Sequence, residues 1–317
     1  MLLDHPAGTP PAVVAPRPFL KWAGGKRQLL PALRRHVPAH FGVYHEPFLG
    51  SAALFFDLVS RGRVASACLS DTNAELVGCF AALRRSADDV IAALGALADA
   101  HAAEGAAHFY EARARFNAAT TAWRAAGGSP EQFDATLAAL FVYLNRTGYN
   151  GLFRRNARGD FNVPAGRYRN PRICDAEGLR TAAAALARPG VALAHAPWQR
   201  VLDDAAPGDF VYFDPPYAPV SATARFTSYT AGGFDDDDQR ALAEAARTLA
   251  RRGCHVVLSN STAPIVLALY EADRATRAAG LRVRRVPARR AINANAARRG
   301  AVLEVIVTNV PEVMGDP

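Results

Sequence analysis

Lysine is almost absent from this sequence. Of the 37 basic residues only Lys21 and Lys26 are lysine, and both lie in the segment Lys21-Trp22-Ala23-Gly24-Gly25-Lys26. Lysine differs from arginine in size, hydration and donor geometry. Two lysines this close together, in a chain that otherwise uses arginine, therefore indicate a site with steric limits. Chance retention of the pair is the alternative.

Cysteine and long apolar runs are also scarce. The four cysteines, Cys68, Cys79, Cys174 and Cys254, form no CxxC pair, so neither a zinc site nor a disulfide framework is indicated. They are interpreted as buried or half-buried thiols. No apolar run approaches the roughly eighteen residues of a membrane span, and the N-terminus lacks a basic region followed by an apolar segment. We expect a soluble, cytoplasmic monomer that needs no metal.

Acidic residues are missing from two stretches that are rich in arginine. Residues 146–172 contain seven arginines against one acid, Asp160, and residues 282–299 contain seven arginines and no acid. These stretches carry +6 and +7, so with a net charge of +8 the rest of the chain sums to −5. Basic residues clustered in this way are typical of proteins that bind nucleic acid. Two solvated, arginine-rich faces are the alternative.

Short apolar runs indicate an α/β fold. Runs at 41–45, 66–70, 191–195, 209–213 and 254–259 are typical of buried strands, each followed by a loop and then a helical stretch. They predict a doubly wound, mostly parallel, Rossmann-like sheet. Two further runs, 281–286 and 302–309, are expected to form an antiparallel hairpin at one edge of that sheet.

A long segment between the second and third predicted strands departs from this rhythm. Residues 85–145 are alanine-rich and helical, with a break at 127–130, and residues 146–172 combine Asn, Gly, Arg and aromatic residues. We expect an inserted helical and target-recognition domain over 85–184. The catalytic domain would consist of 17–84 and 185–312, preceded by a flexible lead over 1–16.

A first motif, Glu46-Pro47-Phe48-Leu49-Gly50-Ser51, follows a predicted strand. Ligands bind at the carboxyl ends of strands in such sheets, and small residues in the turn allow the backbone to approach the ligand. Asp71 ends the next strand, where an acid can accept hydrogen bonds from ribose hydroxyls. A role for Asp71 in capping the following helix is the alternative.

A second motif, Asp214-Pro215-Pro216-Tyr217, ends the apolar strand Phe210-Val211-Tyr212-Phe213. The prolines stiffen the turn and donate no backbone hydrogen bond, so the carbonyl of Pro215 can accept beside the Asp214 carboxylate. Two convergent acceptors suit an exocyclic amine, and Tyr217 offers a face on which an extruded base can stack. A plain Pro-Pro turn is the alternative.

These motifs, in this order, resemble the α-group of amino-methyltransferases and closely resemble the Dam family of adenine-specific DNA methyltransferases, over roughly residues 18–310. The resemblance implies S-adenosylmethionine as the methyl donor and double-stranded DNA as the substrate. It implies that catalysis rests on Asp214, Pro215, Pro216 and Tyr217. It further implies that the cofactor is bound by Trp22, Lys26, Glu46, Phe48, Gly50, Asp71 and Asp214.

The resemblance also implies roles in DNA recognition. Tyr149 would insert between base pairs, Asn150 would help replace the extruded adenine, and Arg154 would read a guanine edge. Lys21 and Tyr168 would contact the outer base pair, and Leu152 with Pro164 would touch a thymine methyl. Further contacts are expected from Arg167, Arg289 and Arg290. The residue types of this segment independently suit stacking and major-groove readout, although an irregular surface loop would carry them too.

Two positions depart from the family pattern. The segment Ala196-Pro197-Trp198-Gln199-Arg200 lacks the acid that the family usually places near the cofactor adenine, which leaves that contact unassigned. Arg169 stands where the family often has lysine, which should alter phosphate contact more than base choice. Arg155, next to Arg154, has no counterpart in base reading and is expected to face phosphates or solvent.

The sequence therefore predicts methylation of adenine N6 in duplex DNA, most simply within GATC, by base flipping and direct in-line transfer. Two alternatives belong to other classes: an RNA or protein amine methyltransferase, whose tetrapeptide more often begins with Asn, and a DNA-binding protein without catalysis. The sequence leaves open whether a restriction endonuclease accompanies the protein.

Overall fold

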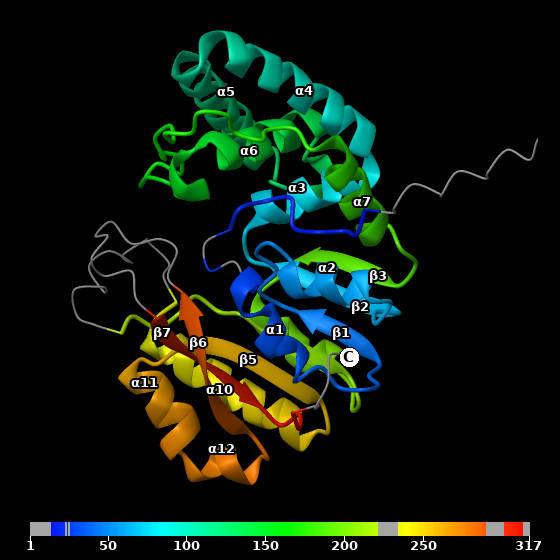
Figure 1. The fold of residues 1–317 in the computed structure, drawn as a ribbon, viewed down its shortest axis with the longest axis vertical. Coiled ribbons are helices and arrows are strands. Elements are labelled where there is room, and N and C mark those ends of the chain that lie inside the picture. The colour runs from blue at the N-terminus through cyan, green and yellow to red at the C-terminus, as the bar shows by residue number, and fades with distance from the viewer. Residues whose placement is uncertain (1–13, 23, 25, 221–233, 290–300, 313–317) are drawn as a thin grey trace, which may run out of the picture.

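A seven-stranded sheet forms the centre of the fold (Figure 1). The computed structural model describes all residues except 1–13, 23, 25, 221–233, 290–300 and 313–317, so most of the expected flexible lead lies outside the described residues. The strand order is β3-β2-β1-β4-β5-β7-β6. The strands are β1 (Val43–Glu46), β2 (Ser66–Asp71), β3 (Val191–His195), β4 (Phe210–Phe213), β5 (His255–Ser261), β6 (Arg282–Arg289) and β7 (Ala301–Thr308).

The pairing of the strands confirms the predicted doubly wound topology. Strands β3, β2, β1, β4 and β5 run parallel to one another, and β7 pairs antiparallel with both β5 and β6. The expected hairpin of β6 and β7 is therefore present at one edge. The apolar run at 191–195 does form a strand, but the expectation that it is buried was wrong. Strand β3 is the opposite edge of the sheet, and its side chains are half-buried or exposed.

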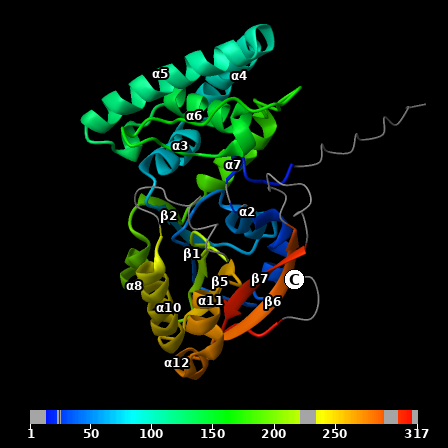
Figure 2. The ribbon, with the colours of Figure 1, turned by 90° about the vertical axis from the view of Figure 1, so that its left-hand side faces the viewer.

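Helices cover both faces of the sheet because the central strands are apolar on both sides. In β4, Phe210 and Tyr212 face one hydrophobic cluster, which includes α1 (Leu30–Arg34) and α2 (Ala53–Ser60). Val211 and Phe213 face a second cluster, which includes α10 (Asp236–Arg251). On that second face also lie α8 (Val201–Asp204), α11 (Pro264–Leu267), the π-helical turn η5 (Ala268–Ala272) and α12 (Arg274–Ala278) (Figure 2).

The chain between β2 and β3 forms a helical insertion above the sheet (Figures 1 and 2). It contains α3 (Ala74–Arg85), α4 (Ala87–Glu104), α5 (Ala106–Ala125), η2 (Pro130–Gln132), α6 (Ala135–Thr147), η3 (Tyr149–Gly151) and α7 (Ala176–Leu186). The predicted break at 127–130 separates α5 from α6, where Gly127 and Gly128 have φ of 102° and 64°. The apolar faces of these helices belong to the same hydrophobic cluster as α1 and α2. The insertion and the sheet therefore share one core.

The sheet order reverses direction between β1 and β4. From β1 the chain proceeds outward through β2 to β3, and from β4 it proceeds outward through β5. Side chains that follow β1 and β4 therefore meet at the carboxyl edge of the sheet, where open α/β sheets bind their ligands. A short 3-10 turn, η1 (Lys26–Gln28), precedes α1.

Candidate active site

A cavity of about 770 Å³ lies at this reversal point, within the size range of ligand pockets. It brings together segments that are far apart in the sequence. From the sheet come the turns that follow β1, β2 and β4 and the turn η4 (Trp198–Arg200) that follows β3. The other segments are the residues that lead into η1, the first turn of α10 and residues 146–172, which we call the recognition segment. Its lining residues are Trp22, Gly24, Lys26, Phe48, Gly50, Ser51, Asp71, Thr72, Phe153, Trp198, Gln199, Asp214, Pro215, Pro216, Tyr217, Phe234 and Asp238.

The turn after β1 brings backbone close to the cavity. Gly50 has φ of +46°, and a Cβ there would lie 3.0 Å from Cδ1 of Trp22. Its amide donates to the Asp71 carboxylate (3.2 Å), which also accepts from the Asn73 amide (2.9 Å). Burial raises the pKa of Asp71, and these hydrogen bonds oppose the rise. Asn73, not Asp71, caps α3 by accepting from Leu76 N (3.1 Å). The Asp71 carboxylate therefore links the turn after β1 to the residue that caps α3, and it also lines the cavity.

Aromatic rings form one wall of the cavity. Phe48 stacks on Trp198, with centroids 6.1 Å apart and planes 22° apart. Phe234 meets Phe48 edge-on at 5.7 Å. Trp22 stacks on Phe153 at 5.8 Å. Flat apolar walls of this kind suit a planar ring system.

Asp214 and Lys26 form an ion pair at the end of β4. Lys26 Nζ lies 2.7 Å from Asp214 Oδ1 and 2.7 Å from the Gly24 carbonyl, and only 6% of Lys26 is exposed. Ser259 Oγ donates to the same carboxylate oxygen at 3.0 Å. Burial raises the pKa of Asp214, whereas the lysine and the serine favour its ionised form. The confined setting of Lys26 agrees with the steric limits expected of this lysine pair.

Hydrogen bonds from neighbouring elements hold the tetrapeptide in place. Gln239 donates to the Pro216 carbonyl (3.2 Å) and accepts from Asn260 Nδ2 (3.0 Å). Asn260 in turn accepts from Ala218 N at 3.2 Å. The Tyr217 hydroxyl donates to Glu304 (3.0 Å), and the Lys26 ammonium lies 4.2 Å from the ring centroid. The tetrapeptide is thus fixed by α10, β5 and β7.

Glu46 is the one residue expected at the cofactor that the structure does not bring to the cavity wall. Glu46 is 2% exposed, and its side chain accepts from the Tyr44 hydroxyl at 2.9 Å. Burial raises its pKa to about 8. The other six, Trp22, Lys26, Phe48, Gly50, Asp71 and Asp214, all line the cavity.

The recognition segment is anchored to the catalytic side by Asn145. Its side chain accepts from Lys21 N (2.7 Å) and donates to the carbonyls of Lys21 (2.6 Å) and Gly151 (3.0 Å). Gly151 has φ of +63°, and a Cβ there would lie 2.5 Å from the Lys21 Cβ. The Lys21 ammonium lies 4.1 Å from the Tyr168 ring centroid. Burial lowers the pKa of Lys21, and the charge of Arg146 lowers it further.

Residues 154–162 form a tight reversal that we call the recognition hairpin. Arg155 bridges Phe161, and the Asn162 amide donates to the Arg154 carbonyl at 3.1 Å. Arg154 is exposed, and its Nε donates to Asn162 Oδ1 at 2.9 Å. Arg155 instead forms an ion pair with the buried Glu75. The expectation that Arg155 faces phosphates or solvent was therefore wrong, because a buried carboxylate of the insertion engages it.

The other residues expected to contact DNA lie on one exposed or half-exposed stretch. Tyr149 is 46% exposed and Tyr168 is 38% exposed. Asn150 has a left-handed backbone, with φ of 55°. The exposed members are Tyr149, Pro164, Arg167, Tyr168 and Arg169, and the half-buried ones are Lys21, Asn150 and Leu152. Arg146 is also half-buried, and burial lowers its pKa, so not every arginine of 146–172 is a surface charge.

The second basic stretch begins on β6. Arg285 is paired with Glu271 at 2.7 Å, and Arg282 donates to the carbonyls of Arg277 and Leu281. Arg284 is exposed. Arg289 ends β6 without a described side chain, and Arg290, Arg298 and Arg299 lie outside the described residues. Their expected contacts with DNA stay predictions.

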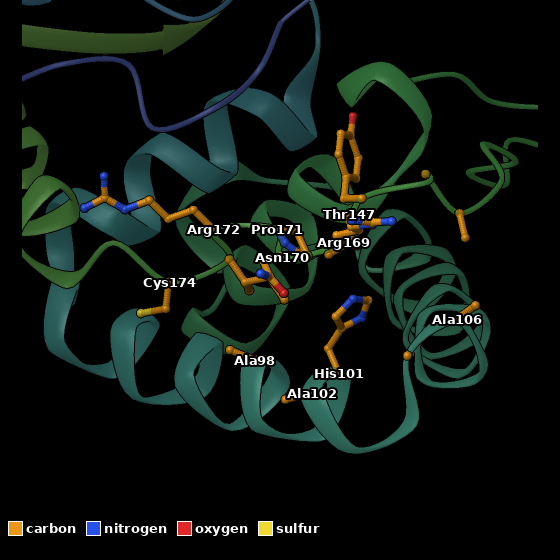
Figure 3. A pocket seen from close by; sticks show the side chains of 15 residues that line it. Ala98, His101, Ala102, Ala106, Thr147, Arg169, Asn170, Pro171, Arg172 and Cys174 are labelled. Atoms are coloured by element: carbon orange, nitrogen blue, oxygen red, sulfur yellow. The ribbon is translucent and has the colours of Figure 1, made fainter.

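A second cavity, of about 680 Å³, lies in the insertion between α4, α5 and residues 165–174 (Figure 3). His101 and Arg169 are among its lining residues (Figure 3), and His101 Nδ1 is 2.8 Å from the Tyr143 hydroxyl. Its walls include Tyr168 but no residue expected to hold the cofactor or the target adenine. The cavity at the strand ends is therefore the candidate active site.

Three further observations bear on expected partners. All four cysteines are free, with Cys79 and Cys254 buried and Cys68 and Cys174 half-buried, as predicted. Within the described ranges, one group has spacing that could hold a metal: Glu104, His108 and Glu111, at the junction of α4 and α5. None of the three lines the candidate active site. No helix that the structure describes is both long and apolar enough to cross a membrane.

Several lining residues were missed by sequence reasoning. Trp198 and Gln199 stand in the segment that lacks the usual acid, and Asp238 reaches the cavity from the first turn of α10. The only sequence signal for Trp198 is its place just beyond a strand, and α10 has none because its approach depends on the packing of the whole sheet. The supporting residues Ser259 and Asn260 are buried polar side chains that follow the apolar run of β5, which is a usable signal. Gln239 stands on the charged helix α10, where a polar residue gives no such signal.

Comparison with known proteins identifies the group to which this arrangement belongs. A protein named type II methyltransferase M1.LlaDCHI, from Lactococcus lactis subsp. cremoris, is 35% identical over 294 residues, covering 92% of this chain and 95% of the relative. Type II methyltransferase M.MjaIII from Methanocaldococcus jannaschii is 34% identical, covering 92% and 99%. The DNA adenine methylase of Escherichia coli K12 is 35% identical, covering 94% and 97%.

The family model of the D12 class N6 adenine-specific DNA methyltransferases matches residues 22–283. That range includes every residue that lines the cavity at the strand ends. The tetrapeptide after β4, the acid that ends β2 and the glycine turn after β1 all fall within it. The chain therefore belongs to the D12 class of N6 adenine-specific DNA methyltransferases.

Proposed function

We propose that the protein transfers the methyl group of S-adenosylmethionine to N6 of adenine in duplex GATC, after the adenine has left the helix. The observation that carries this proposal is the meeting of Asp214, Lys26 and Tyr217 in the same cavity as Asp71 and the aromatic wall. Family membership favours DNA over RNA or protein as the substrate. The intact tetrapeptide favours catalysis over binding alone.

The lining residues fit S-adenosylmethionine. Asp71 offers a carboxylate for ribose hydroxyls, and Phe48 with Trp198 offers a flat wall for the adenine ring. Gln199 and Asp238 supply polar groups that could meet the adenine edge in place of the missing acid. Gly50 permits close approach of backbone, because any side chain there would contact Trp22. When bound, S-adenosylmethionine would supply an electrophilic methyl group on its sulfonium.

Catalysis would rest on orientation and electrostatics. The N6 amine of the target adenine has its lone pair delocalised into the ring, so acceptors on its hydrogens increase its nucleophilicity. The Asp214 carboxylate and the Pro215 carbonyl would accept those hydrogens. Lys26 and Ser259 both contact Oδ1 of that carboxylate and hold it in place, and Tyr217 offers a ring for stacking. Preorganised groups of this kind need no covalent intermediate.

Specificity would come from the recognition segment. Arg154 is exposed and its Nε is held by Asn162, which leaves the two Nη groups to meet O6 and N7 of a guanine. Tyr149, the most exposed aromatic ring of this segment at 46%, would insert between base pairs. The enzyme would work in the cytoplasm, where the chromosome is accessible to it.

The direct test is transfer of labelled methyl groups to duplexes that contain GATC or its single-base variants. We expect labelled N6-methyladenine in GATC and much less in the variants. Asp214→Ala should abolish transfer while changing DNA affinity by less than roughly tenfold, because phosphate contacts dominate binding. Normal turnover by Asp214→Ala would refute the assigned catalytic centre, and a preference for another site would refute GATC.

A further inference from the structure

Glu75 is a buried acid for which the proposed mechanism has no use. It lies in the first turn of α3 and is 1% exposed. Its carboxylate pairs with Arg155 and lies 3.5 Å from Arg124. Burial raises the pKa of Glu75, and the two arginines oppose that rise. An isolated buried carboxylate is costly, so the structure commits two arginines of the insertion to this one group.

Arg155 is adjacent to the residue expected to read a guanine. Both stand on the first arm of the recognition hairpin, where successive side chains point to opposite faces. Arg154 is exposed, while Arg155 turns inward to Glu75 and lies 5.5 Å from the Phe153 ring centroid. Fixing Arg155 on the inner face therefore fixes the direction in which Arg154 leaves the backbone on the outer face.

Arg124 extends the same link to the turn of the hairpin. Its Nη1 donates to the Gly159 carbonyl at 2.9 Å. Gly159 has φ of +85° and donates to the Asn156 carbonyl, which closes the turn. Glu75 thus holds the hairpin directly at its base through Arg155 and indirectly at its turn through Arg124.

The N-terminus of α3 connects Glu75 to the cofactor side of the molecule. Asn73 caps the helix, and its amide is bound by Asp71, which lines the active-site cavity. Only the first turn of α3 separates the cavity wall from the carboxylate that holds the hairpin. The hairpin is therefore positioned relative to the active site by a short path of hydrogen bonds around Asn73 and ion pairs at Glu75.

We propose that Glu75 is a positioning residue for sequence specificity: by holding Arg155 and Arg124 it sets the geometry with which Arg154 reads its base. This inference rests on the proposed function. Bidentate readout demands that the guanidinium be placed accurately. A hairpin released from Glu75 keeps its positive charge and its attraction for DNA but loses the fixed direction of Arg154. Discrimination should fall more than overall affinity.

The test compares kcat/KM on the preferred site with kcat/KM on its single-base variants. For Glu75→Gln and Arg155→Gln we expect this ratio to fall about fivefold or more at the base pair read by Arg154. The double variant should resemble the single ones, because both break one network. Asp88→Asn is the matched control, since it removes an exposed ion pair with Arg180 (2.8 Å) in the same insertion. Its ratio should equal that of the wild type.

The ratio separates positioning from a merely structural role. Loss of folded protein lowers both rates equally and leaves their ratio unchanged. An unchanged ratio in Arg155→Gln, which retains the contact of Glu75 with Arg124, overturns the proposal even if Glu75→Gln fails to fold. A wild-type preference for another sequence overturns the GATC assignment instead, and the same ratio on that sequence still tests Glu75. Absence of any transfer by the wild type overturns both proposals.

Discussion

At the residue scale, opposing effects meet on Asp214. Burial raises the pKa of its carboxyl, whereas Lys26 at 2.7 Å and Ser259 at 3.0 Å stabilise the charged form. The lysine also contacts the Tyr217 ring and the Gly24 carbonyl, so its ammonium has partners on several sides. Under the proposed function, catalysis would therefore depend on a compact cation with little room around it.

Lys26→Arg tests whether charge alone is enough. The guanidinium is larger and planar, and the lysine is only 6% exposed. We expect kcat on a methylatable duplex to fall about tenfold or more, a loss of about 1.4 kcal/mol, despite the retained charge. Lys26→Gln removes the charge and so shows how far kcat falls when no cation is present. Wild-type kinetics in Lys26→Arg would show that the site has no steric limit.

Glu46 should make the stability of the protein depend on pH. Its pKa is 4.5 ordinarily and about 8 in the fold, so the folded state retains a proton that the unfolded state has lost. The free energy of unfolding contributed by this group is greatest below about pH 4.5 and falls as the pH rises to about 8. Glu46→Gln should remove that slope and stabilise the protein at pH 9 by about 1 kcal/mol or more.

Urea unfolding at pH 5, 7 and 9 measures this effect. The Gln side chain can still accept the Tyr44 hydrogen bond, so the packing changes little. Glu244→Gln serves as the control, because Glu244 is exposed and pairs with Arg247 on α10. A Glu46→Gln variant with the same pH dependence as the wild type would contradict the assignment.

At the element scale, the sequence predicts those features whose determining residues lie close together in the chain. The strands were predicted because each is a short apolar run, and the tetrapeptide because its prolines and acid are contiguous. Strand β3 was expected to be buried, yet it is an edge, since the order of strands in the sheet is set by tertiary packing. The Arg155 pair with Glu75 was missed for the same reason: its two halves lie on separate elements.

A prediction about sequence specificity concerns Arg154 in the recognition hairpin. Arg154→Ala should methylate near-cognate sites almost as well as GATC, because losing one bidentate contact costs about 1 to 3 kcal/mol at the cognate base and much less at a wrong one. Arg158 lies in the same hairpin, is exposed, and is the control. Arg158→Ala should weaken all sites similarly. An unchanged ranking of sites for Arg154→Ala would defeat the role assigned to it.

At the scale of the whole molecule, the carboxyl end of β6 and the recognition segment lie on the same side of the sheet. The recognition segment belongs to the insertion that follows β2. Strand β6 is antiparallel to β7, which is antiparallel to β5, so β6 runs in the direction of the parallel strands. Its carboxyl end at Arg289 therefore lies on the same side of the sheet as the carboxyl ends of the parallel strands, where the active site is. In Figure 1 the arrow of β6 points toward the insertion.

This arrangement predicts how affinity responds to salt. Each phosphate neutralised by the protein contributes about 0.9 to the slope of log K against log salt. Replacing Arg289 and Arg290 together by Gln should therefore reduce the slope by up to about 2 and weaken GATC and random duplexes alike. Arg274 and Arg277 are exposed on α12, which precedes the amino end of β6 at the opposite edge, and their double replacement is the control. Binding isotherms between about 50 and 200 mM salt measure both slopes. If the two double variants have equal slopes, Arg289 and Arg290 belong to a solvated face. If affinity falls for GATC duplexes alone, they belong to base recognition instead.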